Sequence, residues 1–195
     1  MKFRAVELNR LDEETIANIR IWRNQDFVRK NMFHSHIITE EEHKRYIDKM
    51  KQDPNRRLFV FYLDGKPFGV TQYDADFKQR ILKSTSGAYL IDEEYQAMGY
   101  GVILYHMGYM ISYHHFGLRT EYVEIIDNNK SALALFYQKD YILDETYKKS
   151  VLIEGEKHEV YRLIGEIKPY NNNTKIEKMM KRLIDQEPME DMLVL

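Results

Sequence analysis

The 195-residue sequence contains no cysteine. This absence excludes disulfide bonds, a thiolate nucleophile, and zinc or iron–sulfur sites built on cysteine ligands. The sequence also lacks a surplus of charge of one sign, because 29 basic and 31 acidic residues give a net charge of -2. Such a balance does not favour nucleic acid or an anionic membrane as a partner, and we expect neither.

Long apolar runs are missing as well. The most apolar window, residues 102–116, contains three histidines and is too short to span a bilayer. The first twenty residues lack the apolar segment of an export signal. With 44% hydrophobic and 31% charged residues, the composition is typical of a globular protein with one main core. We therefore expect a cytoplasmic location.

The spacing of apolar residues predicts alternating strands and helices. Asp12 and Thr39 are expected to cap two N-terminal helices, and Glu42 completes a capping box with Thr39. Two further helices are expected over 102–116 and after Asn129. Segments rich in β-branched and aromatic residues predict seven strands, over 3–6, 58–63, 67–73, 86–91, 121–126, 141–146 and 159–164.

This order predicts an α/β (α+β) fold, with helices on both faces of a mixed, mostly antiparallel sheet of about seven strands. A doubly wound dinucleotide fold is excluded, because its glycine-rich loop would follow the first strand and here it follows the fourth. We expect one domain over 1–168 and an amphipathic helix in the tail, 169–195, which could pack on the domain or on a second subunit of a homodimer. The apolar stripe of this tail helix comprises Ile176, Met179, Met180, Leu183 and Ile184.

A glycine-bearing loop stands between the strand that ends at Ile91 and the helix 102–116. Its sequence is Gln96-Ala97-Met98-Gly99-Tyr100-Gly101. The free amides at a helix start and the close approach that glycine permits can together hold a phosphate. A tight turn that binds nothing would have the same sequence pattern, so the loop alone leaves both interpretations open.

A second motif decides between them. The loop resembles the acetyl-CoA pyrophosphate loop, Arg/Gln-x-x-Gly-x-Gly/Ala, of GCN5-related N-acetyltransferases (GNATs). The segment 129–139 resembles the Asn-x-x-Ala…Tyr-x-Lys helix of that family, although Asp140-Tyr141 replaces the usual Gly-Phe. The resemblance covers about residues 2–163 and implies the GNAT fold with acetyl-CoA as co-substrate. The implied cofactor contacts are Leu90, Ile91, Gln96, Ala97, Met98, Gly99, Tyr100, Gly101 and Asn129.

Transfer of an acyl group from a thioester to an amine needs a base for the ammonium and an acid for the leaving thiolate. The absence of cysteine favours direct attack over a cysteinyl intermediate. The resemblance implies Tyr137 as the acid, and a plain core tyrosine is the alternative. Glu124, between two apolar residues of its strand, is a candidate base if it is partly buried. A solvent-facing glutamate is the other interpretation.

The N-terminal half resembles the GNAT branch that acetylates nucleotide-linked amino sugars in pseudaminic acid biosynthesis. The matching residues are Trp22-Arg23-Asn24, Val28-Arg29, Met32, Ile38-Thr39 and His43. This likeness implies acetylation of the 4-amino group of a UDP-linked dideoxy sugar. The implied substrate contacts are Arg23, Met32, His43, Tyr46, Gln72 and Tyr89. Arg23 could instead form a surface ion pair, and His43 could be an exposed helical residue.

Two other functions stay open. An enzyme of the same fold could acetylate the N-terminus of a ribosomal protein or a small amine. A non-catalytic acyl-CoA-binding or scaffolding module, with the tail as its interaction element, would belong to a different class. The pair His34-x-His36 has no third ligand at a recognisable spacing, so we expect no metal site.

Overall fold

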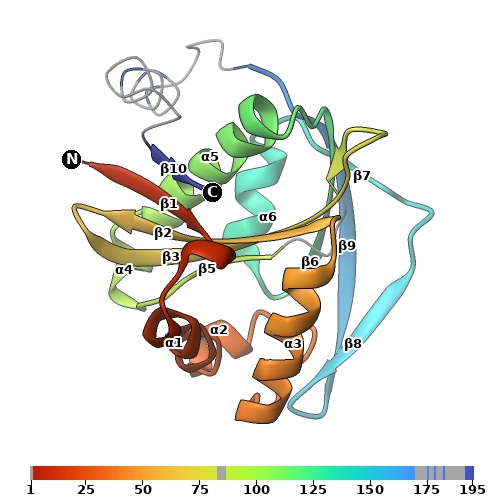
Figure 1. Cartoon of the computed structure of the whole chain (residues 1–195). Helices are drawn as coiled ribbons and strands as arrows, with labels where there is room; N and C mark the ends of the chain where they lie inside the picture. The colour runs from red at the N-terminus through yellow and green to blue at the C-terminus, as the bar shows by residue number, and fades with distance from the viewer. Residues whose placement is uncertain (1, 83–86, 170–174, 176–177, 179–181, 183–191) are drawn as a thin grey trace.

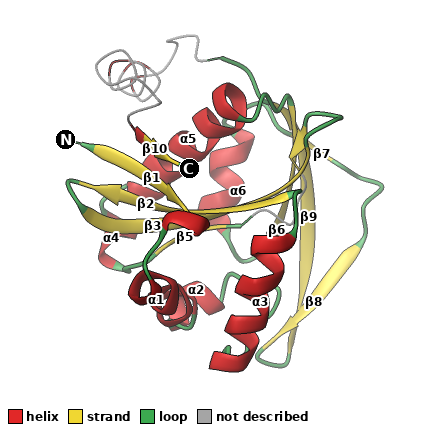
Figure 2. Cartoon of the chain, in the orientation of Figure 1, coloured by secondary structure: helices red, strands yellow, loops and turns green. Residues whose placement is uncertain are grey.

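A central sheet lies between two layers of helices (Figures 1 and 2). The computed structural model describes residues 2–82, 87–169, 175, 178, 182 and 192–195. One face is covered by α1 (Glu13–Arg23), α2 (Asp26–Arg29) and α3 (Glu40–Gln52). The opposite face is covered by α5 (Tyr100–Met110) and α6 (Lys130–Tyr137). The predicted α/β architecture is confirmed.

Within the described residues the sheet has ten strands, in the order β10-β1-β2-β3-β4-β6-β9-β7, with β5 beside β3 and β8 beside β9. Neighbouring strands are antiparallel except for the pairs β1–β10 and β4–β6. The bounds are β1 Phe3–Glu7, β2 Arg56–Leu63, β3 Lys66–Asp76, β4 Ile81–Leu82, β5 Ala88–Leu90, β6 Thr120–Ile126, β7 Ile142–Leu143, β8 Lys149–Ile153, β9 Glu156–Glu166 and β10 Leu193–Val194.

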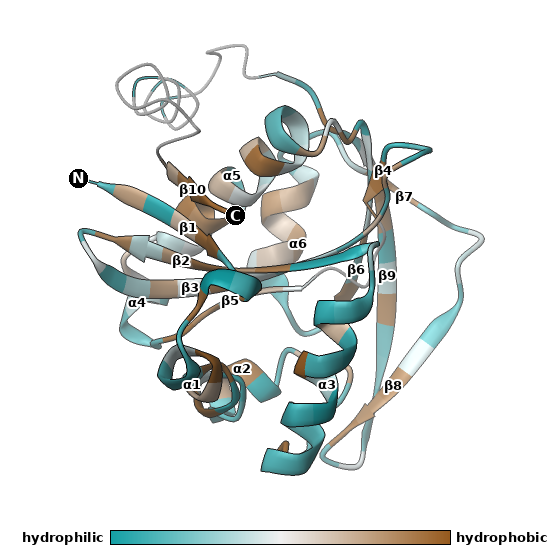
Figure 3. Ribbon diagram, in the orientation of Figure 1, coloured by the Kyte–Doolittle hydropathy of each residue, from teal (hydrophilic) through white to brown (hydrophobic). Residues whose placement is uncertain are grey.

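The core divides along the faces of the sheet. On β2, Leu58 and Val60 pack in the cluster with α1 and α3, whereas Phe59 and Phe61 pack in the cluster with α5. This alternation follows from the two-residue period of a strand. Most of α3 is hydrophilic in Figure 3, and its few apolar residues face the sheet. Both faces of the sheet centre are therefore buried.

The capping predictions are confirmed. The Asp12 side chain accepts a hydrogen bond from the amide of Thr15, and Thr39 and Glu42 form the full capping box. The sequence did not predict α2, β4, β8 or β10. On α6 the buried residues are Leu133 and Phe136, which lie three positions apart on one face of the helix.

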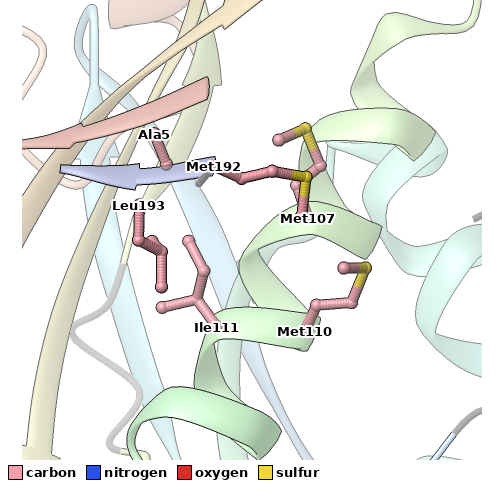
Figure 4. A pocket seen from close by; sticks show the side chains of 6 residues that line it. All are labelled: Ala5, Met107, Met110, Ile111, Met192 and Leu193. Atoms are coloured by element: carbon pink, nitrogen blue, oxygen red, sulfur yellow. The ribbon is translucent and has the colours of Figure 1, made fainter. Parts of the chain in front are cut away.

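The end of the chain is a strand, which corrects the view of the tail as a helix alone. β10 pairs in parallel with β1, and Met192 is 5% exposed against α5. Figure 4 shows Met192 and Leu193 facing Met107, Met110 and Ile111 around a cavity of about 10 Å³. The apolar stripe predicted for the tail helix lies outside the described residues.

The sheet opens between β5 and β6. β5 pairs with residues 69–71 of β3, whereas β4 pairs with residues 75–76 of β3 and also with β6. β6 pairs with β4 and β9, and the described residues show no ladder between β6 and β5. We call this gap the strand opening.

Candidate active site

The glycine loop meets the start of α5 beside the strand opening. After the short helix α4 (Glu94–Ala97), Gly99 adopts φ 78°, a left-handed conformation that residues with a Cβ disfavour. α5 then begins at Tyr100. The first amides of a helix have no intrahelical acceptor, so those of Tyr100 and Gly101 can donate to an anion, as the sequence predicted.

Aromatic packing of Tyr100 holds the loop in place. The Tyr100 ring stacks on Tyr95 at 4.9 Å and meets Phe68 edge-on at 5.8 Å. In contrast, a Cβ built on Gly101 would meet only Leu90 Cδ1, at 3.9 Å. The fold itself therefore does not require glycine at position 101, and the space above it suits the close approach of a pyrophosphate. Met98 is 65% exposed and Gln96 is exposed at the loop tip.

The register of β5 shows which of its backbone groups face the strand opening. The amide of Ile91 donates to Phe68, and the amide of Gln72 donates to Gly87. In an antiparallel ladder, hydrogen-bonded pairs alternate with pairs whose groups point away. The N–H and C=O groups of Leu90 and Ala88 therefore point away from β3 and toward the opening.

This register separates the two strand residues that were expected to bind the pantetheine arm. The Leu90 backbone faces the opening. The Ile91 carbonyl, however, accepts a hydrogen bond from Gln25 Nε2 at 2.7 Å, and its amide is bonded to Phe68. The alternation favours Leu90 and Ala88 over Ile91 as the residues that pair with a ligand.

Helix α6 positions one predicted cofactor contact, Asn129, and one predicted catalytic residue, Tyr137. Asn129 is its N-cap, and the Asn129 side-chain oxygen accepts from the amide of Ala132 at 3.2 Å. That bond uses the Oδ1 atom and leaves the side-chain NH₂ as a donor for a ligand. Tyr137 ends the helix and is 50% exposed, so it is not a core tyrosine.

The opposite face of the sheet, which carries α1 and α3, holds the predicted acceptor residues. Tyr46 donates its hydroxyl hydrogen to Gln72 Oε1 at 2.7 Å. β4 aligns Ala75 of β3 with Glu121 of β6. Continued along both strands, this register puts Gln72 opposite Glu124 across the strand opening. Both side chains lie on the face of the sheet that carries α1 and α3, which we call the acceptor face.

Arg23 is the last residue of α1. Its Nη2 donates to the carbonyl of His34 at 2.9 Å, and its buried Nη1 has no hydrogen-bond partner among the residues that the structure describes. Burial lowers the pKa of the guanidinium, and the hydroxyls of Tyr89 and Tyr46 lie within electrostatic reach of it. The Nη2 atom of Arg23 thus holds the fold, whereas its Nη1 atom can donate to a ligand.

The other predicted substrate contacts, His43, Tyr89 and Met32, have different surroundings. His43 stacks on Tyr46 at 6.5 Å, and its Nε2 donates to the carbonyl of Ile16 at 2.8 Å. Burial lowers the pKa of His43, which favours the neutral ring. Tyr89 is partly buried in the same cluster as Tyr46, and its burial raises the pKa of its phenol. Met32 is partly buried in the connection between α2 and α3.

The burial of the Glu124 side chain excludes the solvent-facing interpretation. Its side chain is 4% exposed and forms ion pairs with Lys149 Nζ and Arg162 Nη2, each at 2.8 Å. The Arg162 guanidinium also lies 3.5 Å from the centre of the Tyr147 ring. Two cations stabilise the carboxylate and occupy both its oxygens, so its role as a base stays a prediction.

The sequence missed a group of side chains that hold the connection between α2 and α3 (residues 30–39). Asn24 bonds both the amide and the carbonyl of Ile38, at 2.8 and 2.9 Å. Arg29 donates to the carbonyl of Ser35 at 2.5 Å. The polar, aperiodic segment after Trp22 was the only signal of such a network.

In the residues that the structure describes, neither the side chains nor the helix lengths offer a cluster of metal ligands or a membrane span. They contain no cluster of three His, Asp or Glu side chains that could hold a metal ion. No helix in the described part of the chain is long and apolar enough to cross a membrane.

Comparisons with known proteins agree with this geometry. The model of the acetyltransferase (GNAT) family matches residues 16–141, which is more than half of the chain. Among solved structures, spermidine N-acetyltransferase from Vibrio cholerae, in complex with CoA and spermine, aligns with a TM-score of 0.72 at 17% identity, over 85% of this chain and 95% of that one. No curated protein matches by sequence.

A second solved structure is the N-acetyltransferase PseH from Campylobacter jejuni in complex with acetyl coenzyme A. It aligns with a TM-score of 0.61 at 18% identity, over 86% of this chain and 100% of that one. At such identities the structural likeness shows a shared fold, whereas the family model identifies the sequence itself. The chain belongs to the GNAT family and is an acetyl-CoA-dependent N-acetyltransferase.

Proposed function

We propose that the acceptor is the primary amine of a nucleotide-linked amino sugar. The observation that carries this proposal is the buried Nη1 of Arg23, which has no partner among the described residues. A buried N–H group without an acceptor costs about 1–3 kcal/mol. A phosphate or sugar oxygen would remove this cost and would use the planar geometry of a guanidinium.

The surroundings of Arg23 suit the rest of such a substrate. The hydroxyls of Tyr46 and Tyr89 lie within electrostatic reach of the guanidinium, and the rings of both tyrosines and of Trp22 pack in one apolar cluster. Aromatic faces of this kind can stack on a nucleobase. The pseudaminic acid pathway is implied by the resemblance of the segment from Trp22 to His43. PseH is one of the structural neighbours, and its 18% identity supports the fold alone.

A polyamine is the second candidate, because the Vibrio cholerae neighbour is a spermidine acetyltransferase. A polycation would need several carboxylates without partners. The carboxylate at the strand opening, Glu124, pairs with Arg162 through one oxygen and with Lys149 through the other, so it can bind at most one ammonium of an acceptor. The charge of the acceptor face therefore favours a substrate with anionic groups.

The bound acetyl-CoA supplies a thioester carbon for attack by the neutral amine. We infer that the amides at the start of α5 bind its pyrophosphate, and that the Leu90 and Ala88 backbones and the Asn129 amide hold the pantetheine arm. The new C–N bond forms as the C–S bond breaks. Tyr137 gives its phenol proton to the leaving sulfur, and the proton of the amine passes to Glu124, directly or through water.

The test is thiol release with three acceptors: a UDP-linked 4-amino sugar, spermidine, and a peptide with a free N-terminus. We expect turnover with the UDP-sugar, and Arg23→Ala should lower its kcat/KM at least tenfold while the Kd of acetyl-CoA stays unchanged. Arg20→Ala is the matched control, since Arg20 is on the same helix and pairs with the exposed Glu40. Faster turnover of spermidine, unaffected by Arg23→Ala, would refute the proposal.

A further inference from the structure

The ammonium of Lys149 sits between a carboxylate and an aromatic ring. Its Nζ lies 2.8 Å from Glu124 Oε2 and 4.0 Å from the centre of the Phe33 ring. A carboxylate on one side and a π face on the other is an arrangement with which proteins bind primary ammonium groups. In chemical terms, Glu124 and Phe33 form an ammonium site, and a lysine of the same chain occupies it.

Lys149 is not the only cation that balances the charge of Glu124. Arg162 Nη2 holds the other oxygen of Glu124 at 2.8 Å, and Arg162 Nη1 lies 4.0 Å from Asp144. Tyr147, beneath the Arg162 guanidinium, also forms a hydrogen bond with Glu124. If Lys149 left, the buried carboxylate would keep one cation and would be ready to accept another.

The aromatic side of the site is held in place independently of Lys149. Phe33 belongs to the 30–39 connection, whose backbone carbonyls at His34 and Ser35 are bound by Arg23 and Arg29. Phe33 therefore does not need the contact with Lys149 to stay near the opening. The Lys149 side chain itself is 36% exposed and comes from β8, so it can swing to solvent.

We propose that the Glu124–Phe33 site binds the ammonium of the acceptor, and that Lys149 occupies this site until the acceptor displaces it. The inference rests on the proposed function only in taking the acceptor to be a primary amine at the strand opening. The exchange replaces one ammonium with another, so the buried charge does not change. It also leaves the acceptor nitrogen beside the carboxylate that is to receive its proton.

The first experiment measures binding of ethylammonium, a probe with no phosphate or sugar, by NMR titration of the full chain. Removing the internal competitor with Lys149→Met should lower the apparent Kd of the probe about tenfold, the factor expected when the site is free in one molecule in ten. Lys157→Met is the matched control, because Lys157 lies on the same hairpin and pairs with the exposed Glu159. Equal or weaker probe binding by Lys149→Met would overturn the proposal.

A second measurement uses the unaltered chain, in case Lys149→Met does not fold. Trace labelling with acetic anhydride reports how accessible each lysine amine is, and Lys157 serves as the internal reference. Saturating ethylammonium should raise the labelling of Lys149 and leave that of Lys157 unchanged. Unchanged or reduced labelling of Lys149 refutes displacement. If displacement occurs but the UDP-sugar is not acetylated, the ammonium site stands and the assigned acceptor fails.

Discussion

At the scale of single residues, β6 carries a second buried carboxyl, Glu121, on the face opposite to Glu124. It is 8% exposed and accepts a hydrogen bond from the Tyr141 hydroxyl at 2.5 Å. Burial raises the pKa of Glu121 from its ordinary 4.5 to about 7, and the hydrogen bond from Tyr141 offsets only part of this. The folded chain therefore holds this carboxyl protonated in mildly acidic solution.

The raised pKa predicts a dependence of stability on pH. The folded state binds the Glu121 proton more tightly than the unfolded chain, so the free energy of unfolding should fall as the pH rises from about 4.5 to about 7. The total loss is on the order of 3 kcal/mol. Urea unfolding across this range should show the decline in the wild type and not in Glu121→Gln. Glu145→Gln, a change at an exposed loop residue, should leave the decline in place. If the decline persists in Glu121→Gln, another group causes it.

Tyr137 yields a prediction about chemistry rather than stability. Removing the half-exposed hydroxyl with Tyr137→Phe should lower kcat roughly 100- to 1,000-fold, because the thiolate would leave without its proton donor. The Kd of acetyl-CoA and the Tm should change little. A steady-state comparison of kcat and KM with a calorimetric Kd checks this. Unchanged kcat would remove Tyr137 from the mechanism.

Some residue roles could be predicted from the sequence and others could not. Gln72 and Tyr46, which were both predicted as substrate contacts, form a hydrogen bond with each other, and each lies in a strand or helix that the sequence predicts. The bond from Gln25 to Ile91, 66 positions away, and the burial of Glu124 under Lys149 depend on the tertiary fold. Sequence patterns carry no direct signal for such contacts.

At the scale of elements, local signals predicted best. The caps Asp12, Thr39 and Asn129 depend on atoms within three residues of each cap, and all three are observed. β4 has two residues and no pattern of its own, and it exists because β3 and β6 offer edges on either side of it. β8 begins with Lys149 and Ser150 and ends with three consecutive apolar residues, so its sequence does not alternate as that of a half-buried strand would.

The loop before α5 can be tested as an element. A side chain at position 101 has room within the protein, so Gly101→Val should cost little stability. It should block the close approach of the pyrophosphate to the helix amides and weaken acetyl-CoA binding about 10- to 100-fold, the value of one or two hydrogen bonds to a charged group. Calorimetric Kd and Tm separate the two effects. Tight acetyl-CoA binding by Gly101→Val would place the pyrophosphate elsewhere.

At the scale of the whole molecule, the two termini meet at one edge of the sheet. β10 adds to β1 in parallel, and Arg10 donates to the carbonyl of Leu195. Figure 1 shows this edge on the far side of β2 and β3 from the β6–β9 half. The sequence did not predict this arrangement, because two residues cannot signal a strand that pairs with another 188 positions away. The end of the chain therefore stabilises the molecule away from its active site.

Met192 tests that conclusion. Its side chain is 5% exposed and lines the cavity beside Met107 and Met110, so Met192→Ala should enlarge an apolar void and cost roughly 2–4 kcal/mol. For a chain of this size the Tm should fall by about 5–15 °C. Leu195→Ala is the control, since the Leu195 side chain is 44% exposed. Because β1, β2 and β3 separate β10 from the strand opening, the Kd of acetyl-CoA below the transition should stay unchanged. A wild-type Tm in Met192→Ala would mean that β10 contributes nothing to the folded state in solution.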